Sequence, residues 1–110
     1  MSDKPSPDKV RLDKFLWAAR FYKTRGLAAE EIDKGRVQVN GAAAKPAREV
    51  RLGDTLQMRQ GAVLRTVRVK ALSHMRGPAA VAHTLYEETP ESIAQRERAA
   101  ERRRLGTEPA

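Results

Sequence analysis

The chemistry that this sequence offers is that of fixed positive charge. It contains no cysteine and no Gly-rich phosphate loop of the Walker type, and its two histidines, His74 and His83, are too isolated to suggest a metal site. Between Arg11 and Arg48, by contrast, nine Lys or Arg residues accompany only four acids. We therefore expect no enzyme activity, no metal and no cofactor, but a surface that binds anions.

Two predicted helices hold most of these charges. In the first, four apolar residues recur at helical spacing and mark the face that is buried in the core: Leu12, Phe15, Leu16 and Ala19. The polar loop YKTR follows, in which Thr24 is the natural N-cap of a second helix that ends at Gly35. The basic residues therefore fall mainly on helix ends, on loops and on the outward face of the strand that follows.

A small sheet is predicted to complete this unit. Val37 and Val39 alternate with polar residues, and Asn40-Gly41 is a strong hairpin signal. Alternation continues to about residue 72, interrupted by turns at Gly53-Asp54 and Gln60-Gly61. The predicted fold class is α+β, with two helices packed on a small, mostly antiparallel sheet and a C-terminal helical extension.

The residues that we expect to contact RNA are the cations of this unit and two neutral side chains that form hydrogen bonds. They are Arg11, Lys14, Arg20, Lys23, Thr24, Arg25, Lys34, Arg36, Asn40, Lys45 and Arg48. Such side chains can follow phosphates and 2′-hydroxyl groups, contacts that position a protein without reading a base sequence. The alternative to RNA contact, for each single Lys or Arg, is that it is only a solvated surface charge. That alternative is favoured for four cations of the sheet, which are Arg59, Arg65, Arg68 and Lys70.

The charge of the whole chain indicates the same class of partner. A net charge of +8 and a pI near 10.4 favour a polyanion. No apolar run approaches the roughly 18 residues of a membrane-spanning helix, so a membrane is not expected as the partner. The polar N-terminus lacks the apolar segment of a secretory signal, and we expect a cytoplasmic protein.

Three segments are predicted along the chain: a flexible N-terminus over residues 1–9, an RNA-binding domain over 10–72, and a C-terminal helical extension and tail over 73–110. In the last segment, residues 79–86 are expected to form a short helix that packs Val81 and Leu85 inward. Thr89-Pro90-Glu91 then begins a longer helix, which Gly106 is expected to stop.

Trp17 and Phe21 lie off the core face of the first predicted helix and need a covering partner. We favour packing against the C-terminal segment, because a small core leaves few other places where that segment can attach. The candidate partners are Val81, Leu85, Tyr86 and Ile93. Stacking of the two aromatic rings on RNA bases is the alternative.

Several of these stretches carry a family resemblance. In order along the chain, RLDKFL, KTRGLA, DKGRVQVNG, KPAREV and GDTL resemble the RNA-binding domain called the alpha-L motif. That domain is shared by ribosomal protein four of the small subunit, many RNA pseudouridine synthases and bacterial tyrosyl-tRNA synthetases. The runs LWAARFYKTR and LYEETPESIAQRERAAERRR resemble a free-standing branch more closely, the bacterial ribosome-associated heat-shock protein fifteen family.

The resemblance, and not the composition, implies a specific function. It implies binding to free large ribosomal subunits that carry a nascent chain on tRNA, and help in recycling them under heat or translation stress. Ribosomal RNA, the large subunit and tRNA are then the expected partners, DNA binds more weakly and without specificity, and the chain is a monomer off the ribosome. The alternative is an accessory or regulatory RNA-binding module that recruits a protein partner through its C-terminal helix.

Overall fold

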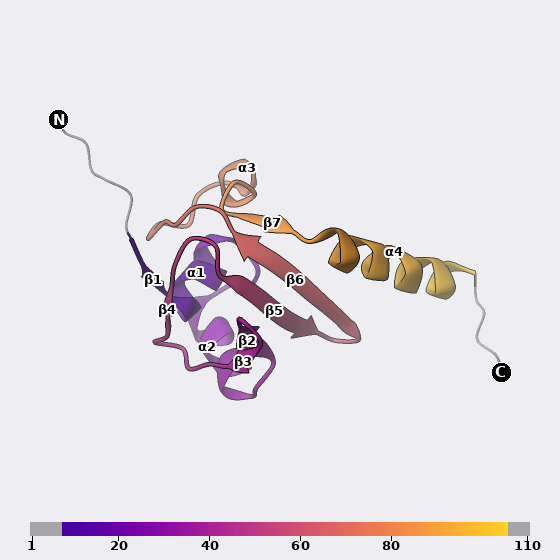
Figure 1. Cartoon of the computed structure of the whole chain (residues 1–110), viewed down its shortest axis with the longest axis horizontal. Helices are drawn as coiled ribbons and strands as arrows, with labels where there is room; N and C mark the ends of the chain where they lie inside the picture. Colours follow the sequence, from indigo (N-terminus) through magenta and orange to yellow (C-terminus); the bar gives the residue numbers. More distant parts are fainter. Residues whose placement is uncertain (1–7, 106–110) are drawn as a thin grey trace.

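A five-stranded antiparallel sheet with two helices on one face forms the body of the protein (Figure 1). The computed structural model describes residues 8–105. In chain order the elements are β1 (Val10–Arg11), α1 (Leu12–Ala18), α2 (Arg25–Asp33), β2 (Val37–Val39), β3 (Ala42–Ala43), β4 (Glu49–Val50), β5 (Thr55–Gln60), β6 (Val63–Val69), α3 (Ala79–Ala82), β7 (Tyr86–Glu88) and α4 (Pro90–Arg104). This architecture confirms the predicted α+β fold class with its C-terminal helix.

The strands alternate as a sheet with one covered face should. Their order is β3-β2-β5-β6-β7, and β1 pairs separately with β4. In the central pairs, Val39 lies opposite Leu56, and Leu56 lies opposite Val67. Six apolar side chains of β2, β5 and β6 are buried, together with the predicted face of α1: Val37, Val39, Leu56, Met58, Val67, Val69, Leu12, Phe15, Leu16 and Ala19. One continuous core therefore joins the sheet to both helices.

Three local signals produce the elements that they predicted. The Thr24 hydroxyl accepts a hydrogen bond from the Leu27 N–H at 3.0 Å and caps α2. Asn40 has φ 53° and Gly41 has φ 83°, the left-handed pair that a tight hairpin between β2 and β3 needs. Thr89 caps α4, and Pro90 occupies its first turn. The predicted stop of that helix at Gly106 lies outside the described residues.

The prediction for residues 79–86 was wrong in part. The helix α3 is only one turn long, and the chain then becomes the strand β7, in which Tyr86 pairs with Val69. Leu85 is buried as expected, but Val81 is 50% exposed. The reason is that β6 has a free edge, and the hydrogen bonds of a strand satisfy that edge better than a helix could.

Phe21 is covered by the C-terminal segment, as we predicted. Its ring lies 4.5 Å from that of Tyr86, measured between centroids, and the side chain is buried. Trp17 is half-buried and packs against the same core. Stacking of the Phe21 ring on an RNA base would require this contact to open.

Candidate nucleic-acid interface

A buried carboxylate lies at the centre of the predicted RNA-binding surface. The Arg11 guanidinium donates from Nε and Nη2 to the two oxygens of Asp13, at 3.1 and 3.0 Å. Arg25, at the start of α2, donates from Nη2 to Asp13 Oδ1 at 3.4 Å. The Asp13 side chain is 6% exposed, whereas those of Arg11 and Arg25 are 50% and 42% exposed. We call these three residues the Asp13 cluster; it presents two guanidinium groups to solvent from a fixed base.

Asp13 stays charged in spite of its burial. Burial alone would raise the pKa of this carboxyl group, but the hydrogen bond from Arg11 and the positive charges of Arg25 and Arg11 outweigh it and lower the pKa. The backbone N–H of Lys14 acts in the same direction. In return, the hydrogen bond and the charge of Asp13 raise the pKa of Arg11. Asp13 is therefore ionised at neutral pH and can pair with both arginines.

The loop of residues 45–48 closes over the start of α1. No side chain caps this helix; instead the Leu12 N–H donates to the Arg48 carbonyl at 2.7 Å, and the Asp13 N–H donates to the Pro46 carbonyl at 3.2 Å. These bonds satisfy N–H groups that a helix start leaves free. They also bring two more predicted contact residues, Lys45 and Arg48, to the same end of α1 as the Asp13 cluster.

The loop of residues 19–24 joins α1 to α2 and carries Lys23, which is exposed. Arg20 is in the left-handed region at φ 68°, and its Nε donates to the Gly77 carbonyl at 2.8 Å. From the other side, Arg76 Nε donates to the Trp17 carbonyl at 3.1 Å. Arg20 thus ties the loop to the C-terminal segment, and its guanidinium is not part of the Asp13 cluster.

A second group of predicted residues gathers at the other end of α2. Lys34 and Arg36 both pair with Glu31, at 3.8 and 3.1 Å. Asn40 is engaged in its own turn, since Nδ2 donates to Asp54 at 3.2 Å and Oδ1 accepts from the Thr55 N–H at 2.9 Å. The predicted site residues therefore fall into two groups, with Arg20 and Asn40 fixed by contacts within the fold.

Arg65 does not lie on a solvated sheet face, contrary to expectation. Its Nε is 4.0 Å from Glu88, and its guanidinium carbon lies 5.9 Å from the centre of the Phe21 ring. Its side chain is 29% exposed. The alternation along β6 could have placed this residue on the inner face beside Val67. Its acidic partner, Glu88, lies in β7, a strand that the sequence did not predict.

Sequence reasoning assigned Asp13 only to the first turn of a helix and missed its role in holding two arginines. The RLD run could have indicated the Arg11–Asp13 pair, because those residues are two apart in the sequence. Within residues 8–105 no group of three or more acids or histidines is placed to hold a metal ion. No helix in the same range is both long and apolar enough to cross a membrane.

A family model and several known proteins are similar to this chain. A family model described as S4 domain matches residues 10–56, which include every predicted contact residue. Heat shock protein 15 of Escherichia coli (strain K12) is 54% identical over 105 residues, covering 96% of this chain and 78% of that protein. The RQC P-site tRNA stabilizing factor of Bacillus subtilis (strain 168) is 48% identical over 63 residues, which are 57% of this chain and 73% of that one.

A solved structure agrees with the fold over nearly the same length. Heat Shock Protein 15 of Vibrio cholerae, described as trimeric, superposes with a TM-score of 0.85 at 47% sequence identity. The match covers 89% of this chain and 99% of that one. The likeness therefore includes much of the chain beyond the S4 match.

Proposed function

The chain belongs to the heat shock protein 15 family and contains an S4 domain, and from this premise we propose that it binds free large ribosomal subunits that carry a nascent chain on tRNA and aids their recycling under heat or translation stress. In general terms, it is an RNA-binding protein that associates with the ribosome. The name of the Bacillus subtilis relative, a factor that stabilises tRNA in the P site, supports tRNA as a neighbour of the bound protein. Such a role needs no catalytic group and belongs in the cytoplasm.

One observation carries the RNA-binding part of the proposal. The Asp13 cluster lies inside the S4 match and holds two guanidinium groups half-exposed on a carboxylate that is itself almost fully buried. Guanidinium groups match phosphate oxygens in shape and charge, and fixing them in advance lowers the cost of ordering them on binding. We expect further positive charge from exposed Lys23 in the loop before α2, and from Lys45 and Arg48 in the loop at the start of α1.

Sedimentation of tagged protein through a sucrose gradient of heat-stressed cell lysate tests the ribosomal part. We expect the protein to migrate with free large subunits and to leave them as salt is raised, with a loss in log affinity of about 0.7 to 0.9 per phosphate contact for each decade of salt. A peak with a protein complex, unaffected by salt, would instead support a module that recruits a partner through α4. Duplex DNA should compete, because phosphate contacts do not select a sequence, but more weakly than RNA, because DNA lacks the 2′-hydroxyl groups.

The oligomeric state follows as a separate proposal. Off the ribosome we expect a monomer, whose mass is 12.3 kDa. The trimeric description of the Vibrio cholerae relative makes this a measurement to perform early. Light scattering of the purified protein over a range of concentrations decides it, because a trimer would have three times the monomer mass.

A further inference from the structure

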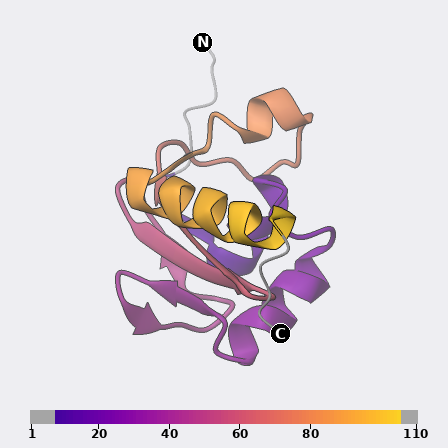
Figure 2. The same cartoon turned by 90° about the vertical axis from the view of Figure 1, so that its right-hand side faces the viewer.

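A groove lies between α4 and the β5–β6 hairpin, outside the S4 match. It has a volume of about 330 Å³ and is lined by Ala62, Val63 and Leu64 of the hairpin and by Gln95, Arg96, Arg98, Ala99 and Arg102 of the helix. Figures 1 and 2 show α4 running beside the hairpin after it leaves β7. We propose that this groove is a second RNA-binding site, which takes the phosphate backbone of an RNA strand. The inference rests on the proposed function and extends it beyond residues 10–56.

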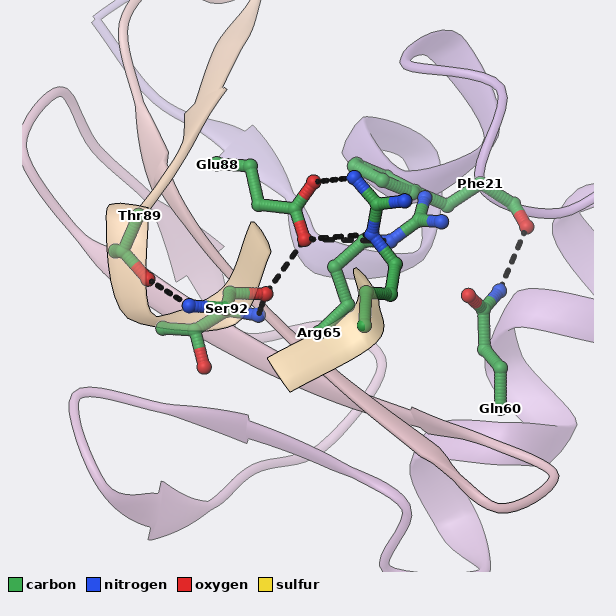
Figure 3. Close-up of polar contacts among 8 residues, drawn as sticks. Phe21, Gln60, Arg65, Glu88, Thr89 and Ser92 are labelled. Atoms are coloured by element: carbon green, nitrogen blue, oxygen red, sulfur yellow. Dashed lines mark hydrogen bonds and ion pairs between the residues drawn. The ribbon is translucent and has the colours of Figure 1, made fainter. Parts of the chain in front are cut away.

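The groove is held open by the way in which α4 is anchored. Glu88 accepts a hydrogen bond from the Ser92 hydroxyl at 2.6 Å and two from Arg96, at 3.0 and 2.8 Å. The Ser92 hydroxyl also accepts from the Thr66 N–H at 2.9 Å, and the Thr89 N–H donates to the Thr66 carbonyl at 3.0 Å. Figure 3 shows Ser92 bonded to both Glu88 and Thr89. These bonds all lie within the first two turns of α4, so they fix the helix direction, and residues from Gln95 onward form the groove wall.

The floor of the groove is the part of β6 that β7 does not cover. The strand β7 pairs only with Val67–Val69, and Ser92 takes its place at Thr66. Beyond that point, Val63 and Leu64 line the groove, and Leu64 is 37% exposed. A strand edge without a neighbouring strand offers N–H groups to an incoming ligand.

The charge of the groove selects an anion. Every ionisable side chain that lines it is an arginine, whereas the three acids of α4, which are Glu91, Glu97 and Glu101, do not line it. Arg96 is paired with Glu88, but Arg98 is exposed. An arginine-lined channel beside a strand edge suits phosphates, and a protein that binds the ribosome is surrounded by RNA. We therefore take RNA, and not an acidic peptide, as the occupant.

A pair of variants tests the proposal. Arg98→Gln removes one charge from the groove, and Arg104→Gln removes one from an exposed residue of the same helix that does not line it. Both are titrated with purified large ribosomal subunits and with protein-free ribosomal RNA extracted from them. We expect Arg98→Gln to bind both probes several-fold more weakly, with a salt slope smaller by about 0.7 to 0.9, while Arg104→Gln binds as the unmodified chain does. Arg98→Glu should weaken binding further, with an unchanged circular dichroism spectrum.

The other outcomes overturn the inference. Equal losses from Arg98→Gln and Arg104→Gln would mean that only total charge matters, and no loss from Arg98→Gln would mean that the groove is empty on the ribosome. A loss with subunits but not with protein-free RNA would assign the groove to a protein. In each of these cases tight binding by the unmodified chain leaves the proposed function standing, whereas failure of that chain to bind either probe would remove both proposals.

Discussion

Replacing Asp13 by Asn gives a prediction opposite to that of bulk electrostatics. The substitution removes a negative charge from a surface that we propose binds RNA, so simple charge counting expects tighter binding. The structure predicts weaker binding, because Asp13 accepts three hydrogen bonds that hold Arg11 and Arg25 in place. The Asn side chain keeps one oxygen but presents an NH₂ group where the second oxygen had accepted a bond.

The size of the effect follows from the exposure of the two arginines. Each hydrogen bond to a buried charge is worth about 1.5 to 3 kcal/mol, but both arginines are roughly half in water, so we expect a loss of only about 1 to 2 kcal/mol in unfolding free energy. Ordering a released side chain on binding costs about 0.5 to 1.5 kcal/mol. For two half-exposed arginines we take an ordering cost of about 1 to 2 kcal/mol in binding free energy, which weakens RNA binding about 5- to 30-fold.

The assay is a titration of labelled ribosomal RNA at constant salt, with thermal unfolding measured on the same samples. Asp33→Asn is the matched control, since it removes the same charge from an exposed position of α2. A double-mutant cycle adds Asp13→Asn to a chain in which Arg11 and Arg25 are already Gln, where we expect no further loss. Affinity that is unchanged or higher for Asp13→Asn would refute the reasoning, and an equal loss in both backgrounds would show a general effect on the fold.

Two further predictions use the same samples. Lys23→Gln with Arg25→Gln should weaken RNA binding more than Arg68→Gln with Lys70→Gln, because the first pair flanks Thr24 at the start of α2 and the second lies on the sheet; equal losses in the titration would argue for charge alone. The hydrogen bond from Arg96, opposed by burial, lowers the pKa of Glu88 below its usual 4.5, so the stability that Glu88 contributes is complete above that pH and is lost as the pH falls through the folded value. Thermal unfolding from neutral pH to about pH 3 should therefore show a shallower loss for Glu88→Gln than for the unmodified chain.

The elements that the sequence predicts correctly are those with local causes. The Thr24 cap, the Asn40-Gly41 turn and the start of α4 each depend on a few adjacent residues, so a single sequence contains the whole signal. The strand β7 depends instead on the free edge of β6, which exists only after the sheet has formed. This is why residues 79–86 were predicted as a longer helix.

In the candidate site, too, only the features with local causes are predictable from the sequence. Which residues are cationic, and which lie near helix ends, can be read from the sequence. Which acid each cation pairs with cannot be read from the sequence. Arg25 of α2 pairs with Asp13 of α1, and Arg65 of β6 pairs with Glu88 of β7. Side-chain pairing of this kind is set by tertiary packing, and it decides which charges are held in place and which move freely.

The C-terminal segment supports the proposed RNA-binding surface from outside it. The loop of residues 19–24 precedes Arg25, carries Lys23, and has contacts beyond those to its own two helices. It is held by Arg20 on the Gly77 carbonyl, by the Gln60 amide on the Phe21 carbonyl, and by the Phe21 ring against Tyr86. A loop that must present charge in a fixed place needs such support, since each ordered side chain has an entropic cost. The strand β7 and the turn before α3 therefore supply rigidity to a surface that they do not themselves form.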